Sequence, residues 1–475
     1  MTVSLLAISV SGVAAQTAEP GTTLAPGTTL PPGTTAPAGT LPRGTGTGRD
    51  AVEVPGPPPP TVPSVLPPML VPPAIGTRPP ATFELHPSIT LSEEYTDNFR
   101  RRRRDTEENF RTSLTPGATL LINGARTQGQ LSGSFSLSHD SATDEIRTLI
   151  SSALGGTVTW QPTPRTFVTL SDFFRRSDDP ELADDLSLRR ERRSFTSNVF
   201  TAAAGWMPGT VSTQAYYRLA TFFNDDAELG DTISHAMGVT AGIPLGQLAS
   251  ASAGYEFLLS DGSNSELTGH QFTASLSRRL GRFASAGVSG SYAWRTRSFD
   301  DRREDEDFTI WSVSVFTGYA LPGRWSLSGN VGYSELDSTD ARRSRSSITT
   351  QSTLAYQFAR GSAYVSVTQG FSETFVLGED VGVVETRGVT VGVSYPLTVL
   401  IWGSAQGFYR ENTFTGIGRG LDGTEEVWGA RASVSVPLRS WLSMSLSYGH
   451  TEWSSGPRGE GFSENRVTLS LTAGY

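Results

Sequence analysis

The chain has 475 residues and a formal net charge of −9, and it contains no cysteine and no lysine, so all 38 basic residues are arginines. The absence of cysteine excludes disulfides, cysteine-ligated zinc and a cysteine nucleophile, and the negative charge argues against nucleic acid as a partner. Only 37% of the residues are hydrophobic, and no apolar run approaches the roughly 20 residues that a membrane-spanning helix needs. A helical membrane protein is therefore excluded, whereas a β-barrel is compatible with these figures.

The N-terminus is expected to be a secretory signal peptide over residues 1–15. Its apolar stretch from Leu5 to Ala14 ends in Val13-Ala14-Ala15, a small-residue pattern that a signal peptidase cleaves. The usual basic start is missing, which is expected if the true start lies upstream of Met1. The alternative is an unordered apolar N-terminus on a cytosolic protein.

Residues 16–82 are expected to form a proline-rich, disordered periplasmic linker. This segment holds 18 of the 29 prolines, first in a repeated Pro-Gly-Thr-Thr motif and then in runs such as Pro57–Pro60. Proline removes backbone donors and favours extended polyproline II, so such a tract cannot pack a core. A second interpretation is that the tract binds a periplasmic partner or a cell-wall polymer.

From Glu84 to the C-terminus, apolar and small polar residues alternate in stretches of about ten. In the last stretch, positions 467, 469, 471, 473 and 475 are apolar or aromatic, while 468, 470, 472 and 474 are Thr, Ser, Thr and Gly. A period of two predicts β-strands with one apolar face and one polar face. A soluble β-sandwich also alternates in this way, so the connections have to decide between the two architectures.

Short turns alternate along the chain with longer hydrophilic loops. Seven of the 11 prolines outside the linker lie in or beside the short turns, where a missing donor costs least. The predicted short turns are 124–126, 161–164, 207–209, 243–246, 280–282, 321–323, 359–361, 395–397 and 436–439. The predicted long loops include 99–111, 175–193, 224–231, 298–307, 337–347, 412–426 and 454–465.

This pattern is typical of an up-and-down transmembrane barrel, in which one rim faces the periplasm and the other faces the outside. Nine short turns predict about 20 antiparallel strands over residues 84–475, with 18 as the alternative because alternation is poor from Ile146 to Trp160. The proline-bearing turns are expected on the periplasmic side. Closure satisfies every backbone donor in lipid, so no helices are needed to cover the apolar face.

Aromatic residues support a membrane location. Eight of the nine tryptophans lie near predicted strand ends, as in the two interfacial belts of membrane barrels. The C-terminal Val467, Leu469, Leu471 and Tyr475 resemble the insertion signal that the barrel-assembly machinery of the bacterial outer membrane recognises. These features predict the outer membrane of a Gram-negative bacterium.

The first barrel residues carry a family resemblance. Tyr95-Thr96-Asp97-Asn98 resembles the opening motif of the putative β-barrel porin type 2 group and of related outer-membrane barrels associated with exopolysaccharide and exosortase systems, and the segment from Leu114 to Leu120 is similar to their second strand. The run from Arg100 to Arg104 and the proline-rich tract depart from that pattern. The resemblance implies location and architecture more firmly than it implies a solute.

Polar side chains of the small-residue parity are expected to line the lumen. Arginines outnumber acidic residues among the candidate lumen residues, so we expect a lumen with a mild preference for anions. Arg218 and Arg431 are expected to face water near the middle of the wall. The alternative is that the arginines near the rim pair with loop carboxylates. The candidate lumen residues are Gln214, Tyr216, Arg218, Glu256, Arg295, Arg297, Arg410 and Arg431.

No catalytic constellation stands out, and neither a metal site nor a cofactor is expected. Two function classes remain. The first is a porin-like channel for small hydrophilic solutes or oligosaccharide, with the loop at 175–193 as a candidate constriction. The second is a structural or interaction barrel with a closed lumen, linked to exopolysaccharide or cell wall. Expected partners are lipid, lipopolysaccharide (which the run from Arg100 to Arg104 could bind), the assembly machinery, the solute and a periplasmic wall polymer.

Overall fold

The computed structural model describes residues 82–475 except 149–150, 184–185, 227–229, 264, 300–304, 321–323, 339–342, 375–380, 417–421 and 475. The predicted signal peptide and nearly all of the predicted linker therefore lie outside the described residues. In the part of the chain that the structure describes, no helix has the length and apolar character to cross a membrane.

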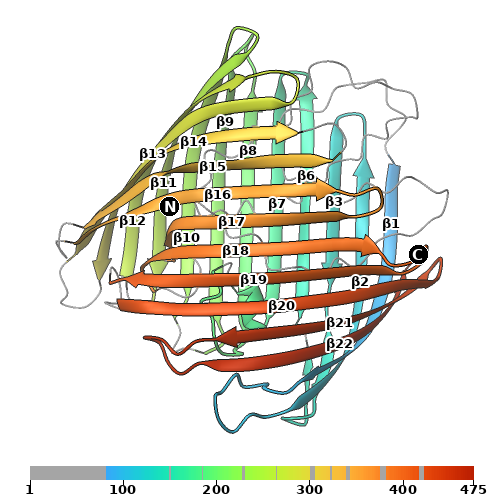
Figure 1. Cartoon of the computed structure of the whole chain (residues 1–475). Coiled ribbons are helices and arrows are strands. Elements are labelled where there is room, and N and C mark those ends of the chain that lie inside the picture. Colours follow the sequence, from blue (N-terminus) through green and yellow to red (C-terminus); the bar gives the residue numbers. More distant parts are fainter. Residues whose placement is uncertain are drawn as a thin grey trace.

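The described chain is almost entirely β-structure (Figure 1). Its strands are β1 (Thr82–Thr96), β2 (Asn109–Asn123), β3 (Thr127–Ser134), β4 (Leu137–Asp140), β5 (Glu145–Thr148), β6 (Ser152–Thr163), β7 (Thr166–Ser177), β8 (Phe195–Trp206), β9 (Ser212–Asn224), β10 (Thr232–Leu245), β11 (Ala249–Gly262), β12 (Ser265–Arg279), β13 (Ala284–Phe299), β14 (Glu306–Ala320), β15 (Trp325–Ser338), β16 (Arg343–Gln357), β17 (Ser362–Glu373), β18 (Val383–Pro396), β19 (Trp402–Thr415), β20 (Asp422–Arg439), β21 (Leu442–Trp453) and β22 (Phe462–Gly474). One 3-10 helix, η2, spans Pro180–Leu182.

These segments form one closed antiparallel barrel. Each strand pairs with its neighbour in the chain, and β1 closes the ring by pairing with β22 from Ser88↔Gly474 to Thr96↔Arg466. β3 and β4 both pair with β2, so together they occupy one strand position of the ring. β6 pairs with β3 and β5 pairs with β4, so β5 and β6 together occupy the next position. The 22 described segments therefore make 20 barrel strands. In Figure 1 the orange and red strands of one wall cross the cyan and green strands of the opposite wall.

The 20-strand prediction is confirmed, and the weak stretch from Ile146 to Trp160 contains the interruption between β5 and β6. Several strands run further than predicted. β13 extends to Phe299, β16 begins at Arg343 and β19 extends to Thr415, so three predicted loops are shorter than expected. The charged residues at these strand ends lie beyond the lipid, because barrel strands continue into water and carry charge there.

Several predicted turns are displaced, since 161–163 lie within β6, 243–245 within β10 and 395–396 within β18, and one predicted turn is wrong over its whole length. Residues 436–439 lie within β20, with a register shift between Pro437 and Arg439, and the turn follows at 440–441. A bulge accommodates the missing proline donor as well as a turn does. The turn at 440–441 lies at the same end of the barrel as the connection from β14 to β15 and the turns at 124–126, 164–165, 207–211, 246–248, 280–283, 358–361 and 397–401. We call this end the short-turn end and the opposite rim the long-loop end.

The outer face of the barrel is apolar and exposed. On β22, for example, Val467, Leu469 and Leu471 are exposed, and on β18 Val389, Val391 and Val393 are exposed. Lipid covers an apolar band of this kind. Closure of the sheet pairs the backbone groups, which would otherwise need water as a hydrogen-bond partner. The apolar parity therefore faces outward, as the alternation predicts.

The inner face changes character along the strands. Next to the short turns of β11, β12, β21 and β22 it consists of half-buried or exposed hydroxyl side chains: Ser250, Ser252, Thr273, Ser275, Ser277, Ser443, Ser445, Ser447, Thr468, Ser470 and Thr472. Toward the long-loop end the same face becomes buried and carries charge, as at Glu256 and Glu464. On these four strands the inner wall is therefore accessible toward the short turns and packed toward the long loops, whereas beside the β6–β7 turn the inward Phe167 and Thr169 are buried.

Candidate functional site

The packed end is built around the connection between β7 and β8, residues 178–194. Its described parts are 178–183 and 186–194, and it contains the 3-10 turn η2, which Asp179 caps by accepting a hydrogen bond from the Glu181 backbone N. Although this segment leaves the wall between β7 and β8, its side chains bind residues of β19, β20, β22 and β1. The segment therefore folds into the barrel and reaches the far wall.

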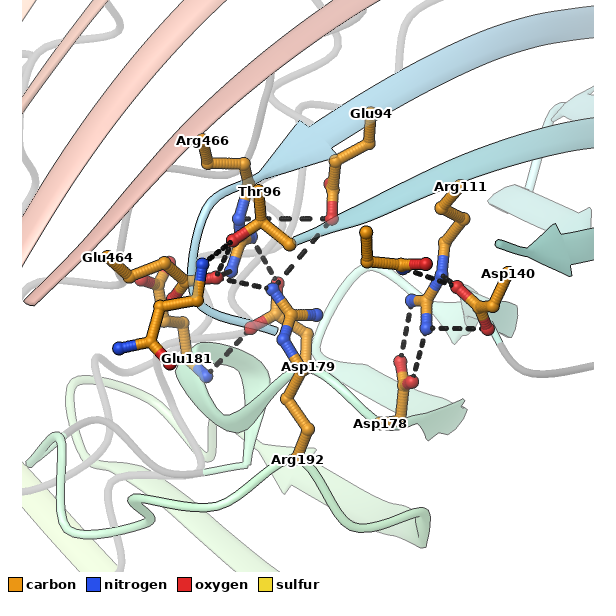
Figure 2. A network of polar contacts seen from close by, with 12 residues as sticks. Glu94, Thr96, Arg111, Asp140, Asp178, Asp179, Glu181, Arg192, Glu464 and Arg466 are labelled. Carbon is orange, nitrogen blue, oxygen red and sulfur yellow. Dashed lines mark hydrogen bonds and ion pairs between the residues drawn. The ribbon is translucent and has the colours of Figure 1, made fainter. Parts of the chain in front are cut away.

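Glu464 on β22 is the centre of the polar contacts (Figure 2). Its carboxylate accepts from Arg101 Nε at 2.8 Å and from Arg192 Nη2, on the inward segment, at 2.7 Å. Thr96 Oγ1 at the end of β1 donates to the same carboxylate at 3.0 Å. The Glu464 side chain is only 2% exposed, so these contacts are made away from water, where charge-assisted bonds are strong.

Asp179 forms the second link between the segment and β22. Arg466 Nη1 donates to Asp179 Oδ2 at 2.8 Å, and Arg466 also lies near Glu94 of β1. Burial by itself would raise the pKa of the Asp179 carboxyl, but the guanidiniums of Arg466, Arg192 and Arg101 outweigh burial and hold that pKa well below its usual value. Asp179 is therefore an anion over the whole physiological pH range.

Arg111 on β2 holds the start of the segment. Its guanidinium donates to both oxygens of Asp178, at 3.0 and 2.6 Å, and to both oxygens of Asp140, at 2.7 and 3.1 Å. Burial favours a raised pKa for Asp178, but the bonds from Arg111 and the charge of Arg192 lower it. Two bidentate pairs on one guanidinium fix the position of the chain where it leaves β7.

The tip of the segment is apolar. Leu186 and Leu188 pack with Val381, Val384 and Phe414 in one buried cluster. Asn412 Nδ2 donates to the Leu186 carbonyl at 2.9 Å, and Arg458 Nη1 donates to the Leu188 carbonyl at 2.6 Å. The segment is thus bound to the far wall by apolar packing as well as by ions.

The remaining part of the long-loop end is closed by the wall itself. Inward residues of β10, β11, β12, β14, β15, β17 and β18 form a second apolar cluster inside the barrel. Its members are Ala236, Leu258, Leu267, Phe308, Leu336, Phe371 and Val383. Trp453, predicted for an outer aromatic belt, faces inward, stacks on Phe462 and lies beneath the Arg190 guanidinium. Apolar packing of the wall therefore fills part of the long-loop end, and the stacked Trp453 and Phe462 add a contact surface for Arg190 of the inward segment.

Three of the predicted lumen residues meet in mid-wall. Tyr216 Oη on β9 donates to Glu256 Oε2 on β11 at 2.6 Å, and Arg218 Nη2 lies 3.6 Å from the same oxygen. Between them, Gly238 of β10 stands in register with both Tyr216 and Glu256. The tyrosine ring passes over Gly238, where a Cβ atom would stand 2.3 Å from Tyr216 Cζ, so only glycine permits this contact. Gln214, one position closer to the short turn on the same face, is buried.

The other predicted arginines are also engaged. Arg295 Nε donates to Glu373 Oε2 of β17 at 3.1 Å, and Arg297 Nε donates to Ser265 Oγ at 3.1 Å. Arg410 Nη1 donates to Ser187 Oγ of the inward segment at 2.7 Å, and Arg431 bonds Glu181 of the same segment.

The charge balance expected for the lumen is therefore wrong. Arg218 and Arg431 lie beside carboxylates, and Glu256 is joined on the inner wall by the buried Glu373 and Glu385. Alternation indicates on which face a residue lies, but not which partner reaches it across the barrel. The anion preference loses its basis, because the arginines that carried it are neutralised within the site.

The residues of the opening motif lie at the seam between β1 and β22. Tyr95 contacts Phe110, with ring centroids 4.9 Å apart. Thr96, Asp97 and Asn98 bond Glu464, Asn465 and Ser463 of β22. Val467, Leu469 and Leu471 of the predicted insertion signal point outward, and Tyr475 lies outside the described residues. The insertion signal stays a prediction.

Sequence reasoning missed Glu464, Asp179 and Arg192, the residues that tie the segment to the wall. A signal for one of them exists: Glu464 and Arg466 occupy the inward parity of the last strand, where Thr468, Ser470 and Thr472 precede the short-turn end. Charge on that parity marks where the small-residue wall ends. No comparable signal marks Asp179 and Arg192, because a loop has no alternation.

Several solved structures are similar to the barrel at low sequence identity. Among solved structures, it is similar to a ferric enterobactin receptor of Pseudomonas aeruginosa (10% identity, 82% of this chain and 80% of that chain, TM-score 0.46). It is also similar to a BenF-like porin of Pseudomonas fluorescens Pf-5, with 12% identity over 82% of this chain and 99% of that chain and a TM-score of 0.40. A third similar structure is OprD of P. aeruginosa, with 10% identity over 82% of this chain and 95% of that chain and a TM-score of 0.36. The comparison with curated proteins finds no match.

The family comparison bears on the last third of the chain. Residues 317–475 match the family described as "Putative beta-barrel porin 2", which confirms the resemblance predicted from the motif at the opposite end of the barrel. With its closed ring and exposed apolar face, the chain is an outer-membrane β-barrel of a Gram-negative bacterium that resembles the porins, and its residues 317–475 are similar to the putative beta-barrel porin 2 family.

Proposed function

We propose that the barrel is a porin-like channel for small hydrophilic solutes, including oligosaccharides, and not an enzyme. The observation that supports this most is the part of the inner wall formed by β11, β12, β21 and β22 near their short turns, which is accessible and lined by small hydroxyl side chains inside a closed 20-strand ring. A ring of this size encloses more space than its inward side chains fill, unlike an eight-strand barrel.

The chemistry of that wall favours uncharged solutes. Hydroxyl groups of adjacent strands pair with one another, as at Thr90 and Thr472 (3.0 Å), Ser252 and Ser275 (2.6 Å) and Ser404 and Ser433 (2.7 Å). Each hydroxyl keeps further donor and acceptor capacity for water or for a sugar hydroxyl. Since the guanidiniums at the long-loop end are engaged with carboxylates and hydroxyls, discrimination between small anions and cations is expected to be weak.

Liposome swelling tests this proposal. Purified full-length protein, and a variant in which residues 180–192 are replaced by a short Gly-Ser link, are reconstituted and exposed to neutral sugars of increasing size. At least one of the two proteins should admit monosaccharides, with a rate that falls as the sugar grows. A second measurement, the reversal potential in a salt gradient, should lie near zero.

The second candidate is a structural or interaction barrel with a closed lumen, linked to exopolysaccharide or cell wall. The packed long-loop end favours it. If neither the full chain nor the shortened variant admits any sugar or passes current, this candidate replaces the channel. Lipid, lipopolysaccharide and the assembly machinery remain proposed partners in either case.

A further inference from the structure

We propose that the segment at 178–194 is a displaceable plug, which closes the long-loop mouth in this structure and has to leave it before solute passes. The inference rests on the proposed channel function and specifies how that channel is regulated. Three observations support it: the attachment of the segment to the neighbouring strands β7 and β8, the side-chain contacts that hold it to the far wall, and the strand pairing that the wall keeps when the segment leaves.

The attachment of the segment makes it a strap across the mouth. It begins and ends on neighbouring strands, since β7 and β8 pair from Thr166↔Trp206 to Ser177↔Phe195. Its partners Arg410, Arg431 and Arg466 lie on β19, β20 and β22, many strands away in either direction around the ring. A connection that reaches so distant a wall crosses the opening.

The contacts that hold the segment to the far wall are separable from the barrel. Side chains make most of them, through Arg192 and Asp179 to β22, through Glu181 to Arg431, and through Leu186 and Leu188 to the cluster around Phe414. The β7–β8 ladder ends at Ser177↔Phe195, so displacement of residues 178–193 breaks no ladder bond of the wall, while the Ser194 carbonyl stays bonded to the Asp225 backbone N. Segments held in this way open at a lower free energy than the strands that carry them.

Glu464 is the residue that couples plug and wall. It binds Arg192 of the segment together with Arg101 and Thr96 of the β1–β2 region, so one carboxylate joins three parts of the chain. Arg192 is itself 4% exposed, so removal of the carboxylate charge leaves a buried cation with weaker compensation. The closed position should become less stable while the strand pairing of β22 is kept.

Planar-bilayer recording of the full chain tests the plug. Wild type is compared with Glu464→Gln and, in case that variant folds poorly, with Arg192→Gln. The matched control is Glu385→Gln, because Glu385 is also a buried carboxylate but bonds Ser347 and Arg387 of the wall. We expect rare openings for wild type and control, and an open probability about tenfold higher for the two plug variants, the change that about 1.4 kcal/mol produces.

A cross-link provides the converse test. The chain has no cysteine, so Leu186→Cys with Asn412→Cys gives a unique pair, at a place where Asn412 Nδ2 bonds the Leu186 carbonyl. A short, reductively cleavable bis-maleimide should abolish openings, and a reductant should restore them. Equal open probability in all variants, with current unaffected by the cross-link, would overturn the plug and leave the channel standing. Silence in every protein, including the one with residues 180–192 replaced, would instead overturn the proposed channel.

Discussion

Asp97 accepts two hydrogen bonds from Asn465, one from its backbone N at 2.8 Å and one from its Nδ2 at 2.6 Å. On either side, Thr96 bonds Glu464 at 3.0 Å and Asn98 Nδ2 donates to the Ser463 carbonyl at 2.8 Å. Three consecutive residues of the opening motif thus bind three consecutive residues of β22. The motif that carries the family resemblance lies where the barrel closes on itself.

Substitution of Asp97→Ala should weaken this closure. Loss of the acceptor leaves the Asn465 backbone N and side-chain amide without it, at a cost of about 1–3 kcal/mol. We expect a lower urea midpoint in detergent and a smaller fraction of folded, heat-modifiable protein on gels. Asp261→Ala, at an exposed carboxylate near the loop end of β11, serves as the control and should behave as wild type. An unchanged midpoint for Asp97→Ala would show that the β-ladder alone holds the seam.

Gly238→Ala should disrupt the mid-wall contact. The added Cβ would stand 2.3 Å from Tyr216 Cζ, so the ring has to move and its bond to Glu256 is lost. Overpacking of this kind costs about 1–3 kcal/mol. Gly281→Ala, where nothing lies within 4 Å, is the matched control. Chemical denaturation that finds both variants equally stable would contradict the account of the Tyr216 ring.

Acid should release the inward segment. Because the pKa values of Asp178 and Asp179 are lowered in the folded protein, the stability they contribute is present above their ordinary pKa of about 3.9 and is lost as the pH falls below it. The groups that face them are Arg111, Arg147, Arg101, Arg192 and Arg466. The protection factors of the amides of residues 186–194, which compare each observed exchange rate with the intrinsic rate at the same pH, should fall as the pH drops from about 5 toward 3, while those of β13 stay high. An equal fall in both regions would indicate general unfolding instead.

The short turns should face the periplasm. Single cysteines replacing Arg360, in an exposed short turn, and Arg103, in the exposed part of the β1–β2 loop, report on the two ends in a chain without other thiols. In intact cells a membrane-impermeant maleimide should label the second and not the first. Labelling of Arg360→Cys alone would invert the orientation.

Deletion of Tyr475 should reduce insertion into the outer membrane. The outward Val467, Leu469 and Leu471 precede it on β22, and assembly is expected to depend on this C-terminal pattern. The amount of heat-modifiable protein in the membrane should fall further than for Tyr319→Ala, which removes an exposed aromatic near a short turn. Equal yields for the two variants would refute an insertion signal.

The sequence predicted the 20 strands because each requires a run of alternation and each short turn interrupts it. It predicted that Tyr216, Arg218 and Glu256 share the inner face for the same reason. It did not predict that Arg295 meets Glu373, because these residues lie on β13 and β17, and contacts across a barrel depend on strand tilt and on how side chains fill the interior.

The contacts of the plug segment could not be predicted from the sequence either. The sequence predicts a long polar loop at 175–193 and a candidate constriction there. The composition of this loop did not reveal that Leu186 and Leu188 are buried with Phe414, since two leucines in a charged loop carry no periodicity. Loop conformation follows from partners that other strands present, and those partners are known only once the ring is closed.

The contact between Asp97 and Asn465 joins residues 368 positions apart in the chain. β1 is the first barrel strand that translation and export deliver, and its partner β22 is the last. Until β22 arrives, the backbone groups on one side of β1 have no native partner, and an unpaired strand edge invites pairing with other chains. β1 therefore waits longest for one of its two neighbours, and its free edge persists until the end of the chain is available to close the ring.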